Sequence, residues 1–498
     1  MDADTQAQPT LCNARLIMPH QYRRRHKTSK QEIMRTSGSR LNSVRCATAL
    51  TVSGWKNNCV IEFDPSGRIA SIQEDSESDV DLYLKGTVIA GMPNLHSHAH
   101  QKVITGLTEH RIAGQDDFWG WRELMYRANA RLDPEQLQTI ARYLYIDMLQ
   151  KGYTSVAEFH YLHHQPDGTP YADRSEMSAQ LLEAACQAGI AITLLPVLYC
   201  RGGFNDEPVQ DAQHRFFNNP EDYLALLESC HSLCAQDPDR SLGFAAHSLR
   251  AVSPSVMSST IEAAGKLLEG APIHIHVAEQ VREVNDCVEI NGARPVAWLY
   301  DQCDVTDRWC LIHATHVDPH EQKLLAQSGA IVGLCPTTEA NLGDGIFPAA
   351  ELMANNGFLG VGSDSQVCTS PAEELRLLEY SQRFSLRRRT VLVPDDAGSN
   401  GRALTTAATI GGNRARGERL AGVQPGARGD LVEIGSDHVE FAGRSPDQIL
   451  DTWIFSGPDN PVQNVVVGGK HVVHDGVHPS MESASRAYRD MVNALDLS

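Results

Sequence analysis

The sequence predicts an α/β fold: a (β/α)8 barrel with a small β-sandwich domain built from both ends of the chain. In residues 89–417, short apolar runs alternate with helical patterns. Shorter β-like runs flank that stretch at 44–88 and 418–475. Alternating strands and helices indicate a parallel sheet, and eight such units are typical of a barrel. Two β-rich segments that flank a long middle in this way suggest one small β-domain assembled from both chain ends.

The first β-like runs are 47–52, 59–63 and 69–72, and a turn at 64–67 separates the last two. Short β-like runs occur again near the end of the chain, at 430–434, 464–467 and 470–473, with a Gly-rich turn at 467–469. Residues 476–498 are expected to form a helical tail.

Eight strand candidates follow one another through the middle of the chain: 88–95, 154–160, 192–199, 242–246, 273–277, 310–313, 330–335 and 358–363. Helical patterns lie between most of them, as at 134–150, 176–188, 223–234, 256–268 and 371–383. Several begin with Asp or Ser before Pro or Glu, as expected of a helix start. A doubly wound open sheet is the alternative, but no Gly-rich dinucleotide turn follows the first strand.

Length and composition are consistent with this architecture. The 498 residues could hold a large barrel plus a smaller domain, and the hydrophobic fraction of 42% supports a sizeable core. No apolar run approaches the roughly 18 residues of a membrane span, and no secretory signal is evident. The twelve cysteines are dispersed, and Cys59, Cys186, Cys310 and Cys335 lie in apolar stretches. We therefore predict reduced core thiols and a cytoplasmic location.

The charge is uneven along the chain. The formal net charge of −19 argues against nucleic acid as a partner. Residues 1–43 differ, with eight basic and three acidic side chains. We predict a basic, disordered extension there, with a targeting arm as the alternative.

Titratable and polar residues gather at the ends of the predicted strands. They are His96, His98, Glu158, His160, Tyr161, His247, Ser248, Arg250, His274, His276, Glu279, His313, Thr337, Thr338, Glu339 and Asp364. Packing alone would not collect so many such groups at one end of apolar strands, whereas barrel active sites lie at that end. The sequence therefore predicts a functional site there.

His96 and His98 are two residues apart on one strand, so their side chains project to the same side. Two such imidazoles can bind a transition metal, although a plain surface or core pair is the alternative. His276 and Asp364 would complete an open ligand set for one divalent ion, with Zn2+ the expected metal. Such an ion lowers the pKa of a bound water to about 7.

Two further residues have candidate catalytic roles. Glu279 lies three residues after His276, just past the strand, where its carboxylate could move a proton. His313 could orient or polarise the group under attack. His274 lies one pleat deeper than His276, so we expect it to serve the structure.

The pattern of His96-x-His98, His276, His313 and Asp364 at the ends of strands one, five, six and eight resembles the amidohydrolase superfamily. The resemblance covers nearly everything after residue 44 and implies a metal-bearing barrel joined to a small β-sandwich. Binuclear members usually have a lysine at the end of strand four. This chain has His247 there, which implies one metal ion per subunit. Members are often dimers, so a homodimer is expected.

Longer stretches resemble the formimidoylglutamate deiminase family: 118–127, 157–164, 247–252, 276–280, 313–316 and 335–345. That family converts N-formimidoyl-L-glutamate and water to N-formyl-L-glutamate and ammonia, in histidine degradation. The resemblance implies a small dicarboxylate substrate. It also implies that Asp364 and His313 help to deprotonate water and that Glu279 protonates the departing nitrogen.

Two substrate carboxylates need local cations in an acidic chain. Arg250 is the first candidate, because a guanidinium binds a carboxylate with two parallel hydrogen bonds. Gln101, Tyr161 and His247 match positions that the family uses around its substrate. Arg122 is a further candidate, in a stretch expected to be a lid loop.

Gln366 departs from the resemblance, because the family commonly has histidine after the Ser-Asp-Ser run at 363–365. A neutral amide cannot relay protons as imidazole can. Two other functions remain open: a related deaminase acting on a purine or other ring amine, and a catalytically silent barrel that binds a partner. Arg250 favours an acyclic dicarboxylate over a neutral ring. The intact metal-ligand set argues against a silent barrel.

Overall fold

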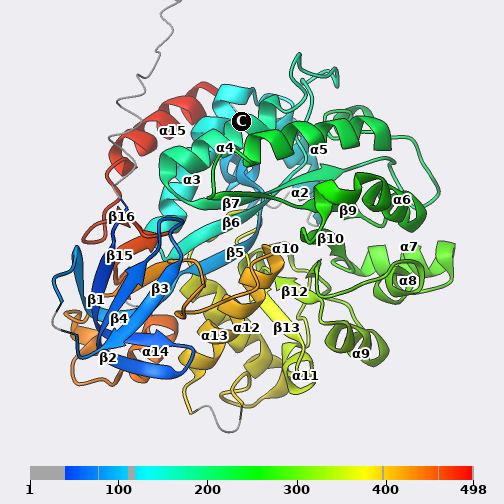
Figure 1. Ribbon diagram of the computed structural model, residues 1–498. Helices are drawn as coiled ribbons and strands as arrows, with labels where there is room; N and C mark the ends of the chain where they lie inside the picture. The colour runs from blue at the N-terminus through cyan, green and yellow to red at the C-terminus, as the bar shows by residue number, and fades with distance from the viewer. Residues whose placement is uncertain (1–39, 77, 110–117, 395–397, 458, 496–498) are drawn as a thin grey trace, which may run out of the picture.

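The computed structural model describes residues 40–495 apart from 77, 110–117, 395–397 and 458 (Figure 1). Most of the expected basic extension therefore lies outside the described residues. The described chain forms a parallel barrel surrounded by helices, with a separate mixed sheet at one side (Figure 1). The predicted fold class is confirmed.

The barrel contains eight strands in sequence order, and every hydrogen-bonded neighbour is parallel. They are β5 (Met92–Ser97), β6 (Tyr153–His160), β7 (Ala191–Leu198), β9 (Phe244–Ser248), β10 (Ile273–Val277), β11 (Trp309–His313), β12 (Ile331–Leu334) and β13 (Phe358–Val361). The short strand β8 (Arg240–Leu242) pairs beside β7. The last strand meets the first through a single parallel bridge between Ser97 and Asp364.

Helices cover the outside of the barrel (Figure 1). They are α2 (Phe118–Asn129), α3 (Pro134–Gln150), α4 (Glu176–Ala188), α5 (Pro220–Cys234), α6 (Pro254–Ala264), α7 (Val281–Asn291), α8 (Pro295–Gln302), α9 (Pro319–Ser328), α10 (Pro336–Leu342), α11 (Ala349–Ala354), α12 (Pro371–Leu386) and α13 (Asn400–Ala415). Two predicted helix starts have the expected cap, since Asp133 accepts from the N–H of Gln136 and Ser253 from that of Val256. Ser175 makes no such bond, because its hydroxyl donates to Asp173 instead.

The small domain is one mixed sheet of seven strands, in the order β16-β15-β14-β4-β1-β2-β3. Four come from the start of the described chain: β1 (Ser43–Thr51), β2 (Gly54–Phe63), β3 (Ile69–Glu74) and β4 (Leu82–Ala90). Three come from its end: β14 (Leu431–Ile434), β15 (Val462–Val467) and β16 (Lys470–Val473). β14 pairs antiparallel with β4, so the two chain ends share one sheet. Helix α14 (Pro446–Phe455) lies between β14 and β15, and α15 (Met481–Leu495) packs on α3 with the rings of Tyr143 and Tyr488 4.5 Å apart.

The expected first barrel strand, 88–95, is wrong as a single strand. Its first half belongs to β4 of the small sheet, and its second half belongs to β5 of the barrel. Gly91 separates the two, and a Cβ atom there would overlap the side chain of Thr154 on the next barrel strand. A continuous apolar run hides this change of sheet, because both halves are buried for different reasons.

A half-buried ion-pair cluster joins the barrel to the small sheet. The Asp239 carboxylate lies 2.8 Å from both the Arg428 guanidinium and the Lys470 ammonium. Burial raises the pKa of Asp239, but the two cations outweigh that effect and hold the pKa at about 2. The interface therefore carries charges that are paired rather than isolated.

Among the cysteines that the structure describes, all are free thiols. Cys59, Cys310 and Cys335 are buried as expected, but Cys186 is exposed, so its prediction was wrong. It lies near the end of α4 on the side that faces away from the barrel, where the apolar pattern of its neighbours does not extend. Nowhere in the described residues is there a helix with the length and apolarity that a bilayer span requires.

Candidate active site

The ends of three barrel strands have strained backbone. Ala278 after β10, His313 at the end of β11 and Asp364 after β13 have φ angles of 52°, 67° and 44°. Non-glycine residues in this left-handed region persist only where the surrounding structure holds them, and they concentrate at functional sites. Each strained position lies at or next to a residue of the predicted site.

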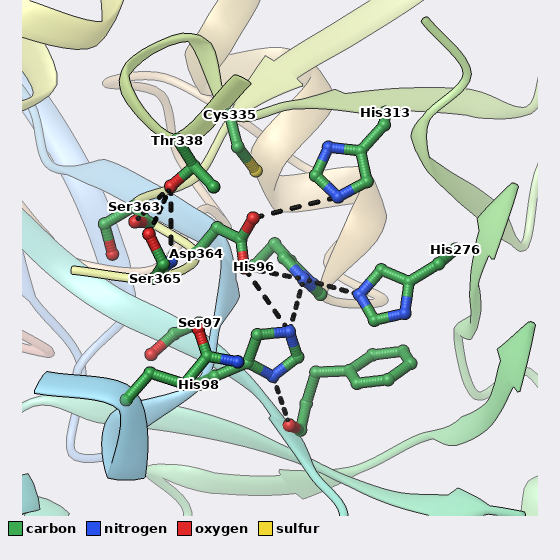
Figure 2. A network of polar contacts seen from close by, with 12 residues as sticks. His96, Ser97, His98, His276, His313, Cys335, Thr338, Ser363, Asp364 and Ser365 are labelled. Atoms are coloured by element: carbon green, nitrogen blue, oxygen red, sulfur yellow. Dashed lines mark hydrogen bonds and ion pairs between the residues drawn. The ribbon is translucent and has the colours of Figure 1, made fainter. Parts of the chain in front are cut away.

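Three histidine rings converge on one point between the strand ends (Figure 2). The Nε2 atom of His96 lies 3.1 Å from Nε2 of His98 and 3.0 Å from Nε2 of His276. For tetrahedral zinc with bonds of 2.0–2.1 Å, the spacing between ligand nitrogens is about 3.3 Å. The observed separations are close to that value.

The hydrogen bonds of the Nδ1 atoms show which nitrogen of the His98 and His276 rings carries the proton. His98 Nδ1 lies 2.8 Å from the carbonyl oxygen of Phe159, and His276 Nδ1 lies 2.9 Å from that of His247. A carbonyl can only accept, so both Nδ1 atoms carry the proton and the Nε2 atoms present lone pairs. Burial lowers the pKa of His98 to about 3, which keeps its ring neutral. Lone pairs this close repel one another unless a cation lies between them.

Asp364 supplies an oxygen to the same cluster. Its Oδ1 lies 3.3 Å from Nε2 of His98 and 3.6 Å from Nε2 of His96. Burial raises the pKa of Asp364 to about 7 and the His313 cation opposes that rise. Three neutral imidazoles and one carboxylate are a donor set that suits zinc or a similar divalent ion. The residues present therefore fit a metal ion.

Cys335 lies beside this cluster, near His313 and Asp364 (Figure 2). Burial raises the pKa of its thiol well above the ordinary value. A neutral thiol is a poor ligand compared with a thiolate, so the histidines and Asp364 are the better ligand set.

His313 is surrounded by carboxylates. Its Nδ1 lies 3.2 Å from Glu339, and its Nε2 lies 3.9 Å from Glu279 and 3.7 Å from Asp364. Burial lowers the pKa of His313, but Glu279 and the other two acids outweigh it and raise the pKa to about 10. A ring with this pKa is a cation held between acids at neutral pH, so both of its nitrogens donate.

A pocket opens above the cluster. Its walls are His98, Gln101, Trp121, Arg122, Met125, Tyr126, Tyr161, Tyr199, Phe216, His247, Arg250, His276, Glu279, His313, Thr338, Leu342 and Asp364. Every residue predicted from the sequence as catalytic, metal-binding or substrate-binding lines this pocket, except His96, which lies behind the other ligands. The structure thus brings the whole predicted set together, while their roles stay predictions.

The predicted substrate-binding residues all line the pocket. The Gln101 amide donates to the Tyr161 hydroxyl at 2.9 Å. Arg250 is half-buried, and its Nε has no hydrogen-bond partner among the described residues. Arg122 lies over the Tyr126 ring, 5.5 Å from its centroid. It belongs to helix α2, so the expectation that its neighbourhood is a loop was wrong.

Sequence reasoning missed several residues that the structure places at the site. Tyr199 lies at the end of a predicted strand, which was a usable signal. Phe216 has no such signal, because it comes from a long connection between β7 and α5. Glu339 is one of the polar residues at the predicted strand ends, but the sequence indicates no role for it, because its contact with His313 depends on the turn into α10.

His274 and Gln366 both lie outside the pocket walls. His274 is buried, with Nε2 2.7 Å from the carbonyl oxygen of Ala415, in keeping with a structural role. Gln366 is fully buried and bonded to its neighbours, so it could not exchange protons with a substrate.

Comparison with known proteins places this site in context. Residues 87–472 match the family described as the amidohydrolase family. The chain is 47% identical, over 457 residues, to a formimidoylglutamate deiminase of Pseudomonas aeruginosa, covering 91% of this chain and 100% of that protein. It is 26% identical to a 5-methylthioadenosine/S-adenosylhomocysteine deaminase of Natronomonas pharaonis, covering 84% of this chain and 88% of that one.

Solved structures agree with the fold. An amidohydrolase from Brucella melitensis superposes with a TM-score of 0.87 at 45% identity, over 91% of this chain and 99% of that chain. A zinc-bound adenosine deaminase from Xanthomonas campestris superposes with a TM-score of 0.74 at 20% identity, over 91% and 98%. The second likeness concerns the fold alone.

Proposed function

The chain belongs to the amidohydrolase family, and from that premise we propose that it hydrolyses N-formimidoyl-L-glutamate to N-formyl-L-glutamate and ammonia. The observation that carries the proposal is the 47% identity to the Pseudomonas aeruginosa formimidoylglutamate deiminase across that protein's whole length. The convergence of the predicted site residues on one pocket supports it independently. The reaction would belong to histidine degradation.

We propose that His96, His98, His276 and Asp364 hold one divalent ion, with zinc the expected metal. When bound, such an ion supplies Lewis acidity, which makes water more acidic and polarises the amidine. The protein contributes the fixed geometry: two of the three rings are oriented by hydrogen bonds from Nδ1 to backbone carbonyls.

His313 and Asp364 are placed to manage the proton of the attacking water. Their Nε2 and Oδ2 atoms are 3.7 Å apart and face the same part of the pocket. In the proposed mechanism Asp364 accepts the water proton, and His313 donates a hydrogen bond to the group under attack. Glu339 anchors His313 from its other nitrogen, which fixes the ring plane.

Glu279 is placed to deliver a proton to the departing nitrogen. Its carboxylate lines the pocket and lies 3.9 Å from His313, on the turn that follows β10. The substrate loses ammonia, so one nitrogen must gain a proton before the carbon–nitrogen bond breaks. A carboxyl group held within reach of that nitrogen is a suitable general acid.

The pocket is lined by both acidic and basic side chains, and the substrate carries groups that can pair with each. Glu279 and Asp364 face the amidine, which is a cation when protonated. Arg250 and Arg122 line the same pocket and would bind the two carboxylates. A neutral purine offers no partner for these arginines, which disfavours the ring-amine alternative.

The test is the release of ammonia by the full chain loaded with zinc. N-formimidoyl-L-glutamate and 5'-methylthioadenosine would be supplied separately at equal concentrations. Ammonia from the first substrate alone is the expected result. Ammonia from the second alone would replace the proposal with a ring-amine deaminase, and none from either, with metal bound, would leave a binding protein.

A further inference from the structure

Gln366 lies in the turn that carries the ligand Asp364. Its own φ is 65° and that of Asp364 is 44°, so two of the turn's residues occupy the left-handed region. Such a turn is costly without glycine and needs support from its surroundings. Gln366 is fully buried, behind the ligands rather than in the pocket.

The Gln366 side chain uses both of its polar atoms. Its Nε2 donates to the Ser97 hydroxyl at 3.0 Å and to the backbone carbonyl of Asp364 at 2.6 Å. Its Oε1 accepts from the Ser363 hydroxyl at 2.8 Å. One amide therefore connects the turn of Asp364 to Ser97, the residue between His96 and His98.

The bonds continue on the far side of Ser97. The Ser97 hydroxyl donates to Glu158 at 2.7 Å, and the same carboxylate accepts from the N–H of Ala99 at 2.6 Å and from the Tyr145 hydroxyl at 3.1 Å. All of these side chains are buried. The segment that carries His96 and His98 is thus held from β6 on one side and from the Asp364 turn on the other.

This is also the seam where the barrel closes. The ends of β5 and β13 meet through the bridge between Ser97 and Asp364. In this bridge the N–H of His98 donates to the Asp364 carbonyl at 3.1 Å, and the N–H of Asp364 donates to the His96 carbonyl at 3.0 Å. Ser97 and Ser363 flank the ligands on the two sides of this seam (Figure 2).

We propose that Gln366 is a positioning residue for the metal centre: its amide joins the strand of His96 and His98 to the turn of Asp364 and sets their separation. The inference rests on the metal centre of the proposed function. It assigns the glutamine a hydrogen-bonding role between the ligand strands, not a proton-relay role in the reaction.

Removing the amide should cost metal affinity. Gln366→Leu keeps similar bulk but leaves Ser363 without its acceptor and the Asp364 carbonyl without one donor. Loss of a group that orients metal ligands typically weakens binding by roughly 10–100-fold. A neutral imidazole has one donor and one acceptor, so Gln366→His should retain most of the affinity.

Gln382→Leu is the matched control. Gln382 is equally buried, at 2% exposure, and its amide donates to the Phe347 carbonyl at 2.9 Å, away from all the ligands. The same substitution there removes a buried hydrogen bond without touching the seam. Ser97→Ala provides a second, smaller perturbation of the network if Gln366→Leu does not fold.

The experiment measures the dissociation constant of zinc for the chelator-treated full chain by competition with a chromogenic chelator. The visible absorption of the cobalt-loaded protein reports ligand geometry in parallel. We expect roughly 10–100-fold weaker binding and an altered cobalt spectrum for Gln366→Leu. Gln366→His and Gln382→Leu should resemble the parent protein.

Unchanged affinity and spectrum in Gln366→Leu would overturn the proposal. Equal weakening in Gln382→Leu would do so as well, because the effect would then be general destabilisation. If Gln366→His lost as much zinc affinity as Gln366→Leu, the proposal would also be wrong, because a side chain with one donor and one acceptor would not be enough to maintain the affinity. If the parent protein bound no metal, the proposed metal centre itself would be wrong. If the parent bound metal normally and Gln366→Leu did not change its affinity, only the role proposed for Gln366 would be wrong.

Discussion

Replacing Arg250 with methionine should weaken the use of N-formimidoyl-L-glutamate while leaving the metal centre in place. Arg250 is half-buried in the pocket wall, and its Nε has no partner among the described residues. Because Arg250 lines the pocket, a carboxylate bound there can reach its guanidinium. Methionine has a similar length but cannot donate, so the carboxylate would lose its partner in a partly desolvated site.

The size of the loss follows from the bonds removed. A guanidinium that binds a carboxylate with two charge-assisted hydrogen bonds loses about 1.5 kcal/mol for each, or about 3 kcal/mol in total. Since about 1.4 kcal/mol corresponds to a tenfold change, kcat/KM should fall roughly 100-fold. Arg250→Lys keeps the charge but only one point of contact, so a fall of roughly 10-fold is expected. The loss should fall mainly on KM, because carboxylate binding is the same in ground and transition states.

The assay is steady-state release of ammonia from two substrates by the parent and both variants. The second substrate is the diamide of N-formimidoyl-L-glutamate, which has the same shape without the negative charges. Bound zinc and the thermal unfolding midpoint are measured for each protein. Arg250→Lys also preserves a cation near the buried Glu283, so it separates lost recognition from lost stability.

An equal fall in kcat/KM on the acid and on the diamide would refute the reasoning, because the effect would not depend on a carboxylate. Normal activity of Arg250→Met on the acid would refute it directly. A fall confined to the acid, with zinc content unchanged, is the expected result for both variants. Only Arg250→Met should also lower the unfolding midpoint, because it leaves the buried Glu283 without its cation.

Three other changes test other parts of the structure. Asp364→Asn should lower both the zinc content and the release of ammonia, measured by metal analysis and by the ammonia assay, because an amide is a weaker ligand than a carboxylate. Asp239→Asn should lower the free energy of unfolding by about 2 kcal/mol at pH 7, because the pKa of Asp239 in the folded protein is about 2, below the ordinary 3.8. This stabilisation is present above about pH 4 and is lost as the pH falls towards 2. The free energies of unfolding of the two proteins, measured in urea, should therefore converge near pH 2. Gly411→Ala should destabilise the protein by about 2 kcal/mol in thermal unfolding, because the new Cβ would overlap the backbone carbonyl of Leu359 in β13, whereas the exposed Thr406→Ala on the same helix should be nearly neutral.

Much of the site followed from local patterns. His96 and His98 share one side because the side-chain period of a strand is two. Parallel strands place their carboxyl ends at one edge, so His276, His313 and Asp364 were expected beside them. These inferences need only the order of the strands and the residue that ends each one. The structure agrees with them in Figure 2.

Other features depended on contacts between distant segments. The apolar run through Gly91 predicts one strand, yet its two halves belong to two different sheets. The sequence does not show where the chain passes from one sheet to the other, because the close approach of Thr154 to Gly91 is a tertiary contact. Phe216 reaches the pocket from a connection with no regular pattern. Glu339 meets His313 through the turn into α10.

Gln366 shows the division most clearly. From the sequence alone, this glutamine stands where the related family commonly has histidine, and its chemistry suggests a missing proton relay. The tertiary structure instead places it behind the ligands, bonded to Ser97, Ser363 and the Asp364 backbone. Residue order along the strands determined which groups surround the metal site. Only the closing of the barrel, which brings β5 against β13, decided what holds those groups in place.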